Sequence, residues 1–400
     1  MRVLKGWTVR LVRYVSLFLA LYSFLFAGET KDLLSGLRQE KLRLEAEKNE
    51  LESDNLKYDW LNQIVASFSR TNSDRKGMDG TMDTFSVVID QPIFKSGGIY
   101  YAVKYANASR EYLRITSRLS EQSEIKSVVS TLLNIKKIDL QILRQNFLID
   151  NAKIDIVRKK EQYDSGFLDS SYLDQAILTK SALQKTLLDM ESSKNELLNT
   201  FKTISDADYL KVAPPVFGMI DKQKYISSSL LVSEKQKETQ RNEYLKKMTI
   251  ANFLPTLSLV AGYYDTNDIF QENYKTYGLK LSMPIFDVNR GRDIQMQKLD
   301  VLKSKVALED TKRSEENLYE NSIKKISFLE QKIDLARQDV ELYSSLLVTT
   351  TDAFKAGEKT IYDVDTLTNS KQTMALDADI FGVDVQLLLL DLYAKMNGEI

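Results

Sequence analysis

The chain of 400 residues contains neither cysteine nor histidine. Without cysteine there is no disulfide and no thiolate metal site. Without histidine, Ser-His and Cys-His triads are excluded, and the commonest general base and transition-metal ligand of proteins are missing. The sequence also shows no glycine-rich phosphate loop and no paired-acid motif. These absences argue against an enzyme, and they predict no catalytic residues, no cofactor and no metal.

Proline and glycine are scarce, with 5 and 15 copies, which is typical of a chain built mainly from helices. Charged residues are abundant but balanced, because 55 Lys and Arg face 56 Asp and Glu for a formal net charge of −1. The overall charge therefore gives no reason to expect a nucleic-acid partner.

Apolar or aromatic residues recur every seven positions between residues 128 and 163. They are Val128, Ile135, Ile142, Ile149, Ile156 and Tyr163, and the series returns 191 positions later at Tyr319, Ile326, Ile333, Val340, Leu347 and Phe354. A strict seven-residue repeat predicts one stripe of a long helix that supercoils against a neighbour. The common offset predicts that one long-helix unit occurs twice in the chain.

A second apolar stripe accompanies the first in each copy. It consists of Leu133, Leu140, Phe147 and Ile154, and later of Phe328, Leu335 and Leu342. These residues lie two positions from the first stripe, about 200° around a helix and thus nearly on its opposite side. Such a helix has a neighbour on each side, as in a wall of helices. A helix buried on all sides in a bundle is the alternative, but charged residues such as Lys137 and Lys159 argue against it.

Residues 1–27 have the pattern of a cleaved signal peptide. Four basic residues precede an apolar run at 15–26, and Ala27 ends a suitable cleavage site. A membrane anchor is the alternative, although the run is shorter than the roughly 20 residues that cross a bilayer. Since no later segment is long and apolar enough to be a spanning helix, any membrane insertion of the exported chain must use strands.

Two regions alternate between apolar residues and small or polar ones, as strand hairpins do. The predicted hairpins cover about 60–93 and 255–286, and they end in the matching phrases QPIF (91–94) and MPIF (283–286). Strands of about 10 residues suit tilted strands that cross a bilayer. A soluble hairpin with one wet face is the alternative.

Each predicted hairpin is followed by a long helix, at about 99–163 and 291–354. A helix of about 65 residues is a rod on the order of 100 Å long, far more than a globular domain of this size needs. Both rods end at a glycine, Gly166 or Gly357, and return helices follow at about 171–204 and 361–397. The charged segments 31–58 and 221–250 are also predicted to be helical.

Four phrases in this order resemble the TolC-like outer-membrane efflux proteins. They are QYDSGFLDSSYLDQA (162–176), NFLPTLSLVAGYY (252–264), YGLKLSMPIFDVNRGR (277–292) and FKAGEKTIYDVDTL (354–367). The resemblance implies a mostly α fold with a small β part, arranged as tandem repeats at 28–218 and 219–400. Each repeat would add a β-hairpin to a shared transmembrane barrel and a long helical hairpin to a periplasmic α-barrel.

The resemblance also implies a passive homotrimeric channel that spans the outer membrane, contacts its lipid and extends into the periplasm. Such a channel is the exit duct of a tripartite efflux or type I secretion system. Its expected partners are a periplasmic adaptor protein and an inner-membrane pump of the RND, ABC or MFS type. An isolated chain would leave open strand edges, which a bilayer does not tolerate.

Several tip residues take roles from the resemblance. The turns that match adaptor-docking turns are Ser165, Gly166, Phe167 and Ala356, Gly357, Glu358. Family members carry constriction acids six and nine positions after the second glycine, where this chain has Asp363 and Thr366. The other nearby acid, Asp365, lies about 200° from Asp363 on a helix, so we expect one acidic ring, from Asp363. A solvated surface aspartate is the alternative.

The closed-state latch of the family is altered in this sequence. A tyrosine three positions before the second glycine is replaced by Phe354, and an aspartate six positions after the first glycine is replaced by Tyr172. The basic residue persists as Lys359, with Ser171 as a candidate partner. The usual hydroxyl–carboxylate bond therefore cannot form.

A periplasmic structural or adaptor-type coiled coil without a pore is the main alternative function. An adaptor has one helical hairpin flanked by small β domains. Two helical hairpins and two strand pairs favour the channel instead.

Overall fold

The computed structural model describes residues 30–73, 80–267 and 272–398. The predicted signal peptide at 1–27 lies outside these residues, as do residues 74–79 of the first predicted hairpin. The fold is mostly helical with one small antiparallel sheet, which confirms the predicted fold class.

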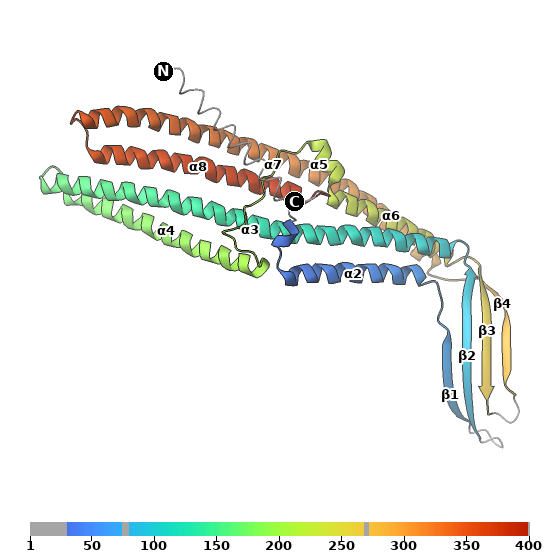
Figure 1. Ribbon diagram of the computed structural model, residues 1–400. Helices are drawn as coiled ribbons and strands as arrows, with labels where there is room; N and C mark the ends of the chain where they lie inside the picture. The colour runs from blue at the N-terminus through green and yellow to red at the C-terminus, as the bar shows by residue number, and fades with distance from the viewer. Residues whose placement is uncertain (1–29, 74–79, 268–271, 399–400) are drawn as a thin grey trace, which may run out of the picture. The chain divides into compact units, whose positions relative to one another are not determined.

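The helices and strands follow one another in the order shown in Figure 1. The elements are η1 (Thr30–Leu33), α2 (Gly36–Tyr58), β1 (Val65–Ser73), β2 (Gly80–Phe94), α3 (Gly98–Asp164), α4 (Ser170–Ile204), α5 (Lys222–Ser228), α6 (Leu230–Ala251), β3 (Thr256–Thr266), β4 (Tyr274–Ser282), α7 (Arg290–Lys355) and α8 (Ile361–Tyr393). Residues 60–64 and 283–286, expected in strands, lie outside β1 and β4. The helix expected at 221–250 is divided at Ser229 into α5 and α6.

The described chain divides into two compact units that cut across the sequence repeats. The first unit contains the described residues up to Lys41, Ser120–Ser229 and the chain from Glu315 onward. The second unit contains Leu42–Leu119 and Leu230–Ser314, and so holds all four strands. Both long helices, α3 and α7, contribute to both units.

The sheet of the second unit has the order β1-β2-β3-β4, so one strand pair from each sequence repeat joins a single sheet. All neighbouring strands are antiparallel, and a register shift between Pro92 and Phe94 interrupts the ladder near the end of β2. Proline has no amide hydrogen to donate, which explains why regular pairing ends there. Strands β1 and β4 form the two edges.

Helices of the second unit lie in the order α2–α3–α6–α7, as their side-chain contacts show. Arg110 of α3 pairs with Asp54 of α2 at 2.6 Å. The guanidinium of Arg241 on α6 lies 4.4 Å from the ring centre of Tyr112 on α3. Lys305 of α7 pairs with Glu243 of α6 at 3.1 Å.

The first unit has the helix order α4–α3–α8–α7. Lys194 of α4 pairs with Asp139 of α3 at 2.7 Å, and Lys137 of α3 pairs with Asp384 of α8 at 2.7 Å. Lys332 of α7 lies 5.4 Å from the ring centre of Phe381 on α8. Helix α3 therefore has a neighbour on each side.

The burial of the predicted stripes agrees with the helix order α4–α3–α8–α7, in which α3 lies inside and α7 at one end. On α3, Val128, Ile135 and Ile149 of the first stripe are buried, and so is Leu133 of the second stripe. On α7 Ile326 of the first stripe is fully buried, but the second stripe is exposed. Its members Phe328, Leu335 and Leu342 expose 63%, 60% and 55% of their surface. Within one chain, this side of α7 remains uncovered.

A buried polar network ties α5, α7 and the chain end together in the first unit. The Tyr225 hydroxyl donates to Glu315 at 2.5 Å, and Lys395 reaches the other oxygen of that carboxylate at 3.0 Å. Tyr225 stacks on Tyr319, whose hydroxyl donates to the Ile220 carbonyl at 2.6 Å. Burial, followed by the neighbouring Glu315, raises the pKa of the Tyr225 hydroxyl far above its ordinary value.

Within the described ranges, no helix contains an apolar stretch long enough to cross a membrane.

We predict that Tyr225→Phe lowers the free energy of unfolding by about 2 kcal/mol, because the buried Glu315 carboxylate loses a charge-assisted hydrogen bond. Thermal or urea unfolding of the purified protein measures this change. Tyr319→Phe, which removes a neutral hydrogen bond to a carbonyl, is the control and should cost about 1 kcal/mol. Equal costs for the two variants would show that Glu315 does not depend on Tyr225.

Candidate functional site at the hairpin tips and the sheet face

The two hairpin tips share one hydrogen-bond pattern at the 191-residue offset. The Gly166 amide donates to the Tyr163 carbonyl and the Phe167 amide to Gln162, at 2.9 and 2.8 Å. The equivalent bonds from Gly357 and Glu358 reach Phe354 and Ala353, at 3.0 and 2.9 Å. This pairing is a Schellman motif, which requires a left-handed residue after the helix. The glycines meet this need with φ of 75° and 78°.

Both predicted docking turns are open to solvent. The ideal Cβ positions at Gly166 and Gly357 have no atom within 4 Å, and Phe167 exposes 83% of its surface. Ser165, Ala356 and Glu358 are also exposed. The turns therefore present a fixed backbone geometry with free space around it.

A capping residue begins each return helix at the same offset, Asp169 for α4 and Thr360 for α8. The Asp169 carboxylate accepts a hydrogen bond from the Ser171 amide at 2.9 Å. At α8, Asp363 closes a capping box by accepting from both the Thr360 amide and its hydroxyl, at 2.9 and 2.8 Å. Asp363, which was predicted to line the constriction, thus caps the start of α8.

The carboxylate of Asp363 also pairs with Arg158 of α3 at 2.8 Å. The backbone and side-chain hydrogen bonds from Thr360 lower its pKa below the ordinary value, and the charges of Arg158 and Lys359 act in the same direction. Partial burial opposes them. Asp363 is therefore ionised at neutral pH, and its charge is partly compensated.

The two other predicted constriction residues lie differently. Thr366 is half-buried toward α3, where its carbonyl accepts from Asn151 at 3.5 Å, and its hydroxyl donates to the Tyr362 carbonyl at 2.7 Å. Asp365 is exposed. Asp363 and Thr366 therefore share the α3 side of α8, whereas Asp365 does not.

The predicted latch residues Phe354, Lys359, Ser171 and Tyr172 are all exposed. Among residues 30–73, 80–267 and 272–398, no hydrogen bond or ion pair joins any two of them. The structure instead places the contacts between the two helical hairpins on α3 and α8.

These α3–α8 contacts form a ladder at seven-residue intervals, which we call the heptad ladder. Its ion pairs are Lys137–Asp384, Arg144–Asp377 and Arg158–Asp363, at 2.7, 2.6 and 2.8 Å. Between the second and third pairs, Asn151 contacts Asn369 and Ser370 at 2.9 and 3.3 Å. Every basic member is on α3 and every acidic member on α8, which fixes the antiparallel register over about 30 Å.

A signal for this ladder is present in the sequence, although the prediction from apolar residues missed it. Basic residues at 137, 144 and 158 are spaced by multiples of seven, as are the residues of the first apolar stripe. The acids at 363, 377 and 384 have the same spacing. The pairing of α3 with α8, rather than with α4 alone, could not be read from either series by itself.

The sheet carries the second part of the candidate site, an apolar face. The pairing register places these residues on one side: Ala66, Phe68, Phe85, Val87, Ile89, Leu257, Leu259, Ala261, Tyr263, Tyr277, Leu279 and Leu281. Tyr277, Leu279 and Leu281 of the edge strand expose 89%, 67% and 72% of their surface. From Leu257 to Tyr263 the apolar band extends about 20 Å along the strand.

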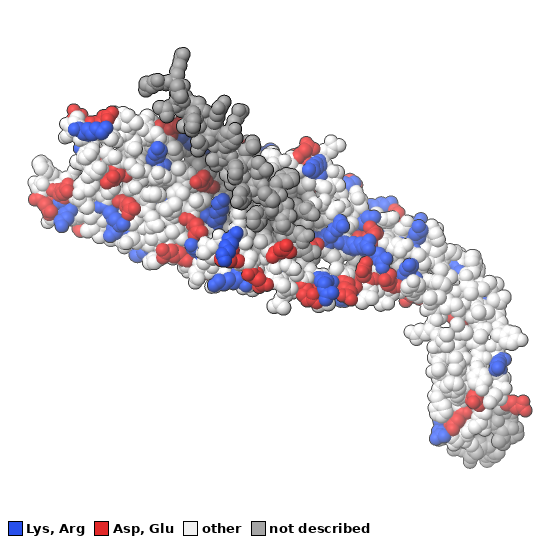
Figure 2. All heavy atoms as spheres, viewed as in Figure 1, with Lys and Arg blue, Asp and Glu red and all other residues white. Residues whose placement is uncertain are grey.

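Polar groups border this apolar face and occupy the opposite one. Arg70 and Asp83 form a bidentate ion pair, with both N–O distances 2.7 Å, on the apolar side near the loop end of the strands. On the opposite side, the Ser67 and Ser86 hydroxyls lie 2.7 Å apart and Lys280 pairs with Asp90 at 2.9 Å. Figure 2 shows dense charge over the helices and few charged side chains over the strands.

No cluster of three or more acidic side chains in the described part of the chain could hold a metal ion.

Comparison with known proteins found no matching family model and no matching curated protein. Solved structures match across most of the chain. The outer membrane protein VceC from Vibrio cholerae shows 12% identity and a TM-score of 0.72, over 92% of this chain and 95% of that chain. The CmeC outer membrane channel of Campylobacter jejuni shows 14% identity and a TM-score of 0.68, over 92% and 85%.

The open state of the MtrE outer membrane channel of Neisseria gonorrhoeae matches with 12% identity and a TM-score of 0.63, over 92% of this chain and 87% of that chain. These likenesses show the fold at low sequence identity. The chain has the fold of these outer-membrane channels, which confirms the fold expected from the resemblance to TolC-like proteins.

We predict that Arg144→Asp weakens the attachment of α8 to α3, because it places two carboxylates opposite each other. The purified protein should lose about 1–2 kcal/mol of unfolding free energy, and Asp377→Arg in the same chain should restore about 1 kcal/mol. Thermal unfolding of the single and double variants measures the coupling.

Lys153→Asp is the matched control, because Lys153 pairs with Asp150 on the same helix and both side chains are about half exposed. It should change stability by less than about 0.5 kcal/mol. A double variant no more stable than Arg144→Asp alone would contradict the heptad ladder.

Proposed function

We propose that the protein is a passive outer-membrane channel, the exit duct of a tripartite efflux or type I secretion system. The exposed apolar face of the four-stranded sheet, with unpaired strands at both edges, is the observation that carries this proposal. An apolar strand face of about 20 Å suits the hydrocarbon core of a bilayer. Open edges in lipid must be closed by other copies of the chain.

The exposed helix stripes support a ring in which each copy contacts the next head to tail. In the first unit, Leu335 and its stripe on α7 are exposed, and so are Leu178 and Leu188 at the other end of the helix order, on α4. In the second unit, Leu299 of α7 and Leu51 of α2 hold the same positions, with 53% and 60% exposure. Different surfaces that complement each other produce a closed ring when the rotation closes.

A homotrimer fits this arrangement. Two copies would provide eight strands, and a barrel of that size is filled by its own side chains. Three copies leave a lumen. The helices of the ring then continue the lumen as a tube, and transport through it involves no chemical step by the protein.

We assign the Gly166 and Gly357 turns as the docking points for a periplasmic adaptor, which would connect the tube to an inner-membrane pump of the RND, ABC or MFS type. Their open surroundings and shared backbone geometry support this role. Residues 1–27 would direct export, and the pump would select the cargo and supply the energy.

We predict that the protein fractionates with outer membranes as a detergent-resistant trimer. Leu335→Glu should shift it to smaller species, because a charge in the α7 stripe cannot be buried against the next copy. Size-exclusion chromatography with light scattering measures the mass. Leu335→Met keeps the stripe apolar and should remain trimeric, whereas a soluble wild-type monomer would contradict the channel.

We predict that Asp363→Asn reduces, without abolishing, the cation preference of the channel in single-channel recordings. The effect is partial because Arg158 already compensates part of the Asp363 charge. Asp365→Asn is the control and should leave the preference unchanged. The reverse result would place Asp365, and not Asp363, in the lumen.

A further inference from the structure

Basic residues gather where the helices of the second unit meet the strands. We call residues 57–64, 93–104, 244–256 and 282–293 the junction segments. Their basic residues are Lys57, Lys95, Lys104, Lys246, Lys247, Arg290 and Arg292, against three acids at Asp59, Asp287 and Asp293. The balanced charge of the whole chain conceals this local excess.

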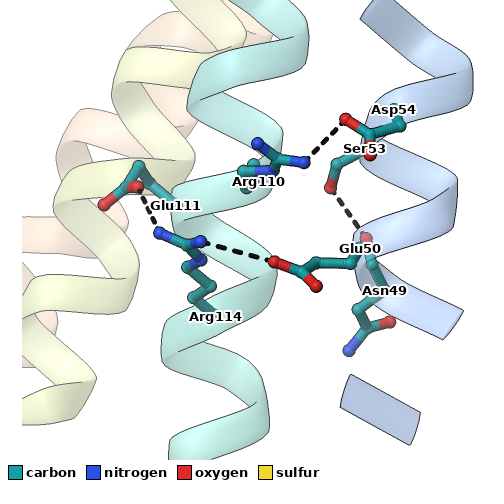
Figure 3. Close-up of polar contacts among 7 residues, drawn as sticks. All are labelled: Asn49, Glu50, Ser53, Asp54, Arg110, Glu111 and Arg114. Carbon is teal, nitrogen blue, oxygen red and sulfur yellow. Dashed lines mark hydrogen bonds and ion pairs between the residues drawn. The ribbon is translucent and has the colours of Figure 1, made fainter. Parts of the chain in front are cut away.

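None of these seven basic side chains has a carboxylate within ion-pair distance among the residues described by the structure. Their neighbours along the same helices behave differently. In Figure 3, Arg110 reaches Asp54 at 2.6 Å, and Arg114 contacts Glu50 and Glu111 at 3.4 and 3.5 Å. Basic residues further along the helices from the strands therefore have acidic partners, whereas the basic residues of the junction segments do not.

Aromatic rings accompany the unpaired cations. Lys104 lies 5.6 Å from the ring centre of Tyr100, and Lys247 lies 5.4 and 5.8 Å from those of Tyr101 and Tyr244. Tyr100 and Tyr101 touch edge to face at 5.3 Å, which joins these five residues into one tyrosine–lysine cluster on α3 and α6. Tyrosine and lysine together are typical of the boundary between a bilayer and water.

Exposed apolar residues occupy the same junction segments. Ile285 and Phe286 expose 92% and 85% of their surface, and Phe94 exposes 56%. Along the chain, they follow the apolar residues of β2 and β4 and lie in the segments that hold the unpaired cations.

Resting on the proposed function, we propose that the junction segments form a collar that binds the phosphate headgroups of anionic phospholipids in the periplasmic leaflet. Lys104 and Lys247 of the tyrosine–lysine cluster supply direct contacts. The apolar residues beside them enter the acyl region, and the unpaired ammonium groups meet the headgroups, where each contributes to attraction by an anionic surface. Because the collar cations lack acidic partners in the described chain, they are free to form ion pairs with lipid phosphate groups.

The test compares lipids on the full-length protein purified in detergent. Phosphatidylglycerol or phosphatidylcholine is added at equal concentration, and thermal unfolding is followed. A ligand that binds the folded state raises the Tm, so we expect a rise of a few degrees that is larger with phosphatidylglycerol. Glycerol phosphate, which lacks acyl chains, should not produce it, and 1 M salt should remove it.

The variant Lys104→Gln/Lys247→Gln should lose the difference between the two lipids, and Lys104→Arg/Lys247→Arg should keep it. The matched control Lys237→Gln/Lys303→Gln removes the same charge from α6 and α7 and should also keep it. Lys237 lies about 15 Å from Lys247 along α6, and Lys303 lies about 20 Å from Arg290 at the start of α7. A difference that survives Lys104→Gln/Lys247→Gln, or is equally lost in the control, would overturn the collar. A response to glycerol phosphate equal to that to phosphatidylglycerol would overturn it as well.

Flotation with vesicles separates the two proposals. Wild-type protein reconstituted into phosphatidylcholine vesicles should float with them whether or not the collar prefers anionic lipid. Flotation without any lipid difference in Tm would overturn the collar and leave the channel standing. Failure to float with either phosphatidylcholine or mixed phosphatidylcholine–phosphatidylglycerol vesicles would overturn both.

Discussion

An uncovered apolar stripe on α7 is the constraint on which the proposed assembly depends. Helix α3 has α4 on one side and α8 on the other, so both of its stripes find partners within the chain. Helix α7 packs on α8 but leaves Phe328, Leu335 and Leu342 more than half exposed. Exposed apolar surface of this extent marks a contact with another molecule.

The same incompleteness recurs in the sheet and in both compact units. Strands β1 and β4 have one free edge each, and α2 and α4 expose apolar residues at the ends of their helix orders. In the proposed ring, contacts between neighbouring copies would cover these surfaces, because they lie at opposite ends of the helix order in each unit. In that proposed ring, each chain would be one segment of a wall.

Polar contacts fix the register between α3 and α8. The apolar seam of a long helix can slide by seven residues with little loss, because every repeat presents a similar surface. The ion pairs at Arg144 and Arg158, with the neutral contact at Asn151 between them, distinguish one register from the next. Asp363 pairs with Arg158 of α3 and also caps α8. One residue therefore fixes both where α8 begins and how α8 aligns with α3.

Much of the fold could be predicted from the sequence because the long helices have a strict period and the repeat has a constant offset. The seam at Val128 and Ile326, the glycine turns and the alternation along β3 each follow from local patterns. The break at Ser229 and the late start of β1 do not, since tertiary packing decides where such ends fall. The partner of Arg158 was also beyond sequence reasoning, because it requires knowing that α8, not α4, faces that side of α3.

Electron microscopy of the purified particle tests the central claim most directly. If the exposed stripes and strand edges close against neighbouring copies, end-on projections will show a ring with three-fold symmetry around a central bore. A compact particle of a single copy, without a bore, would contradict the account.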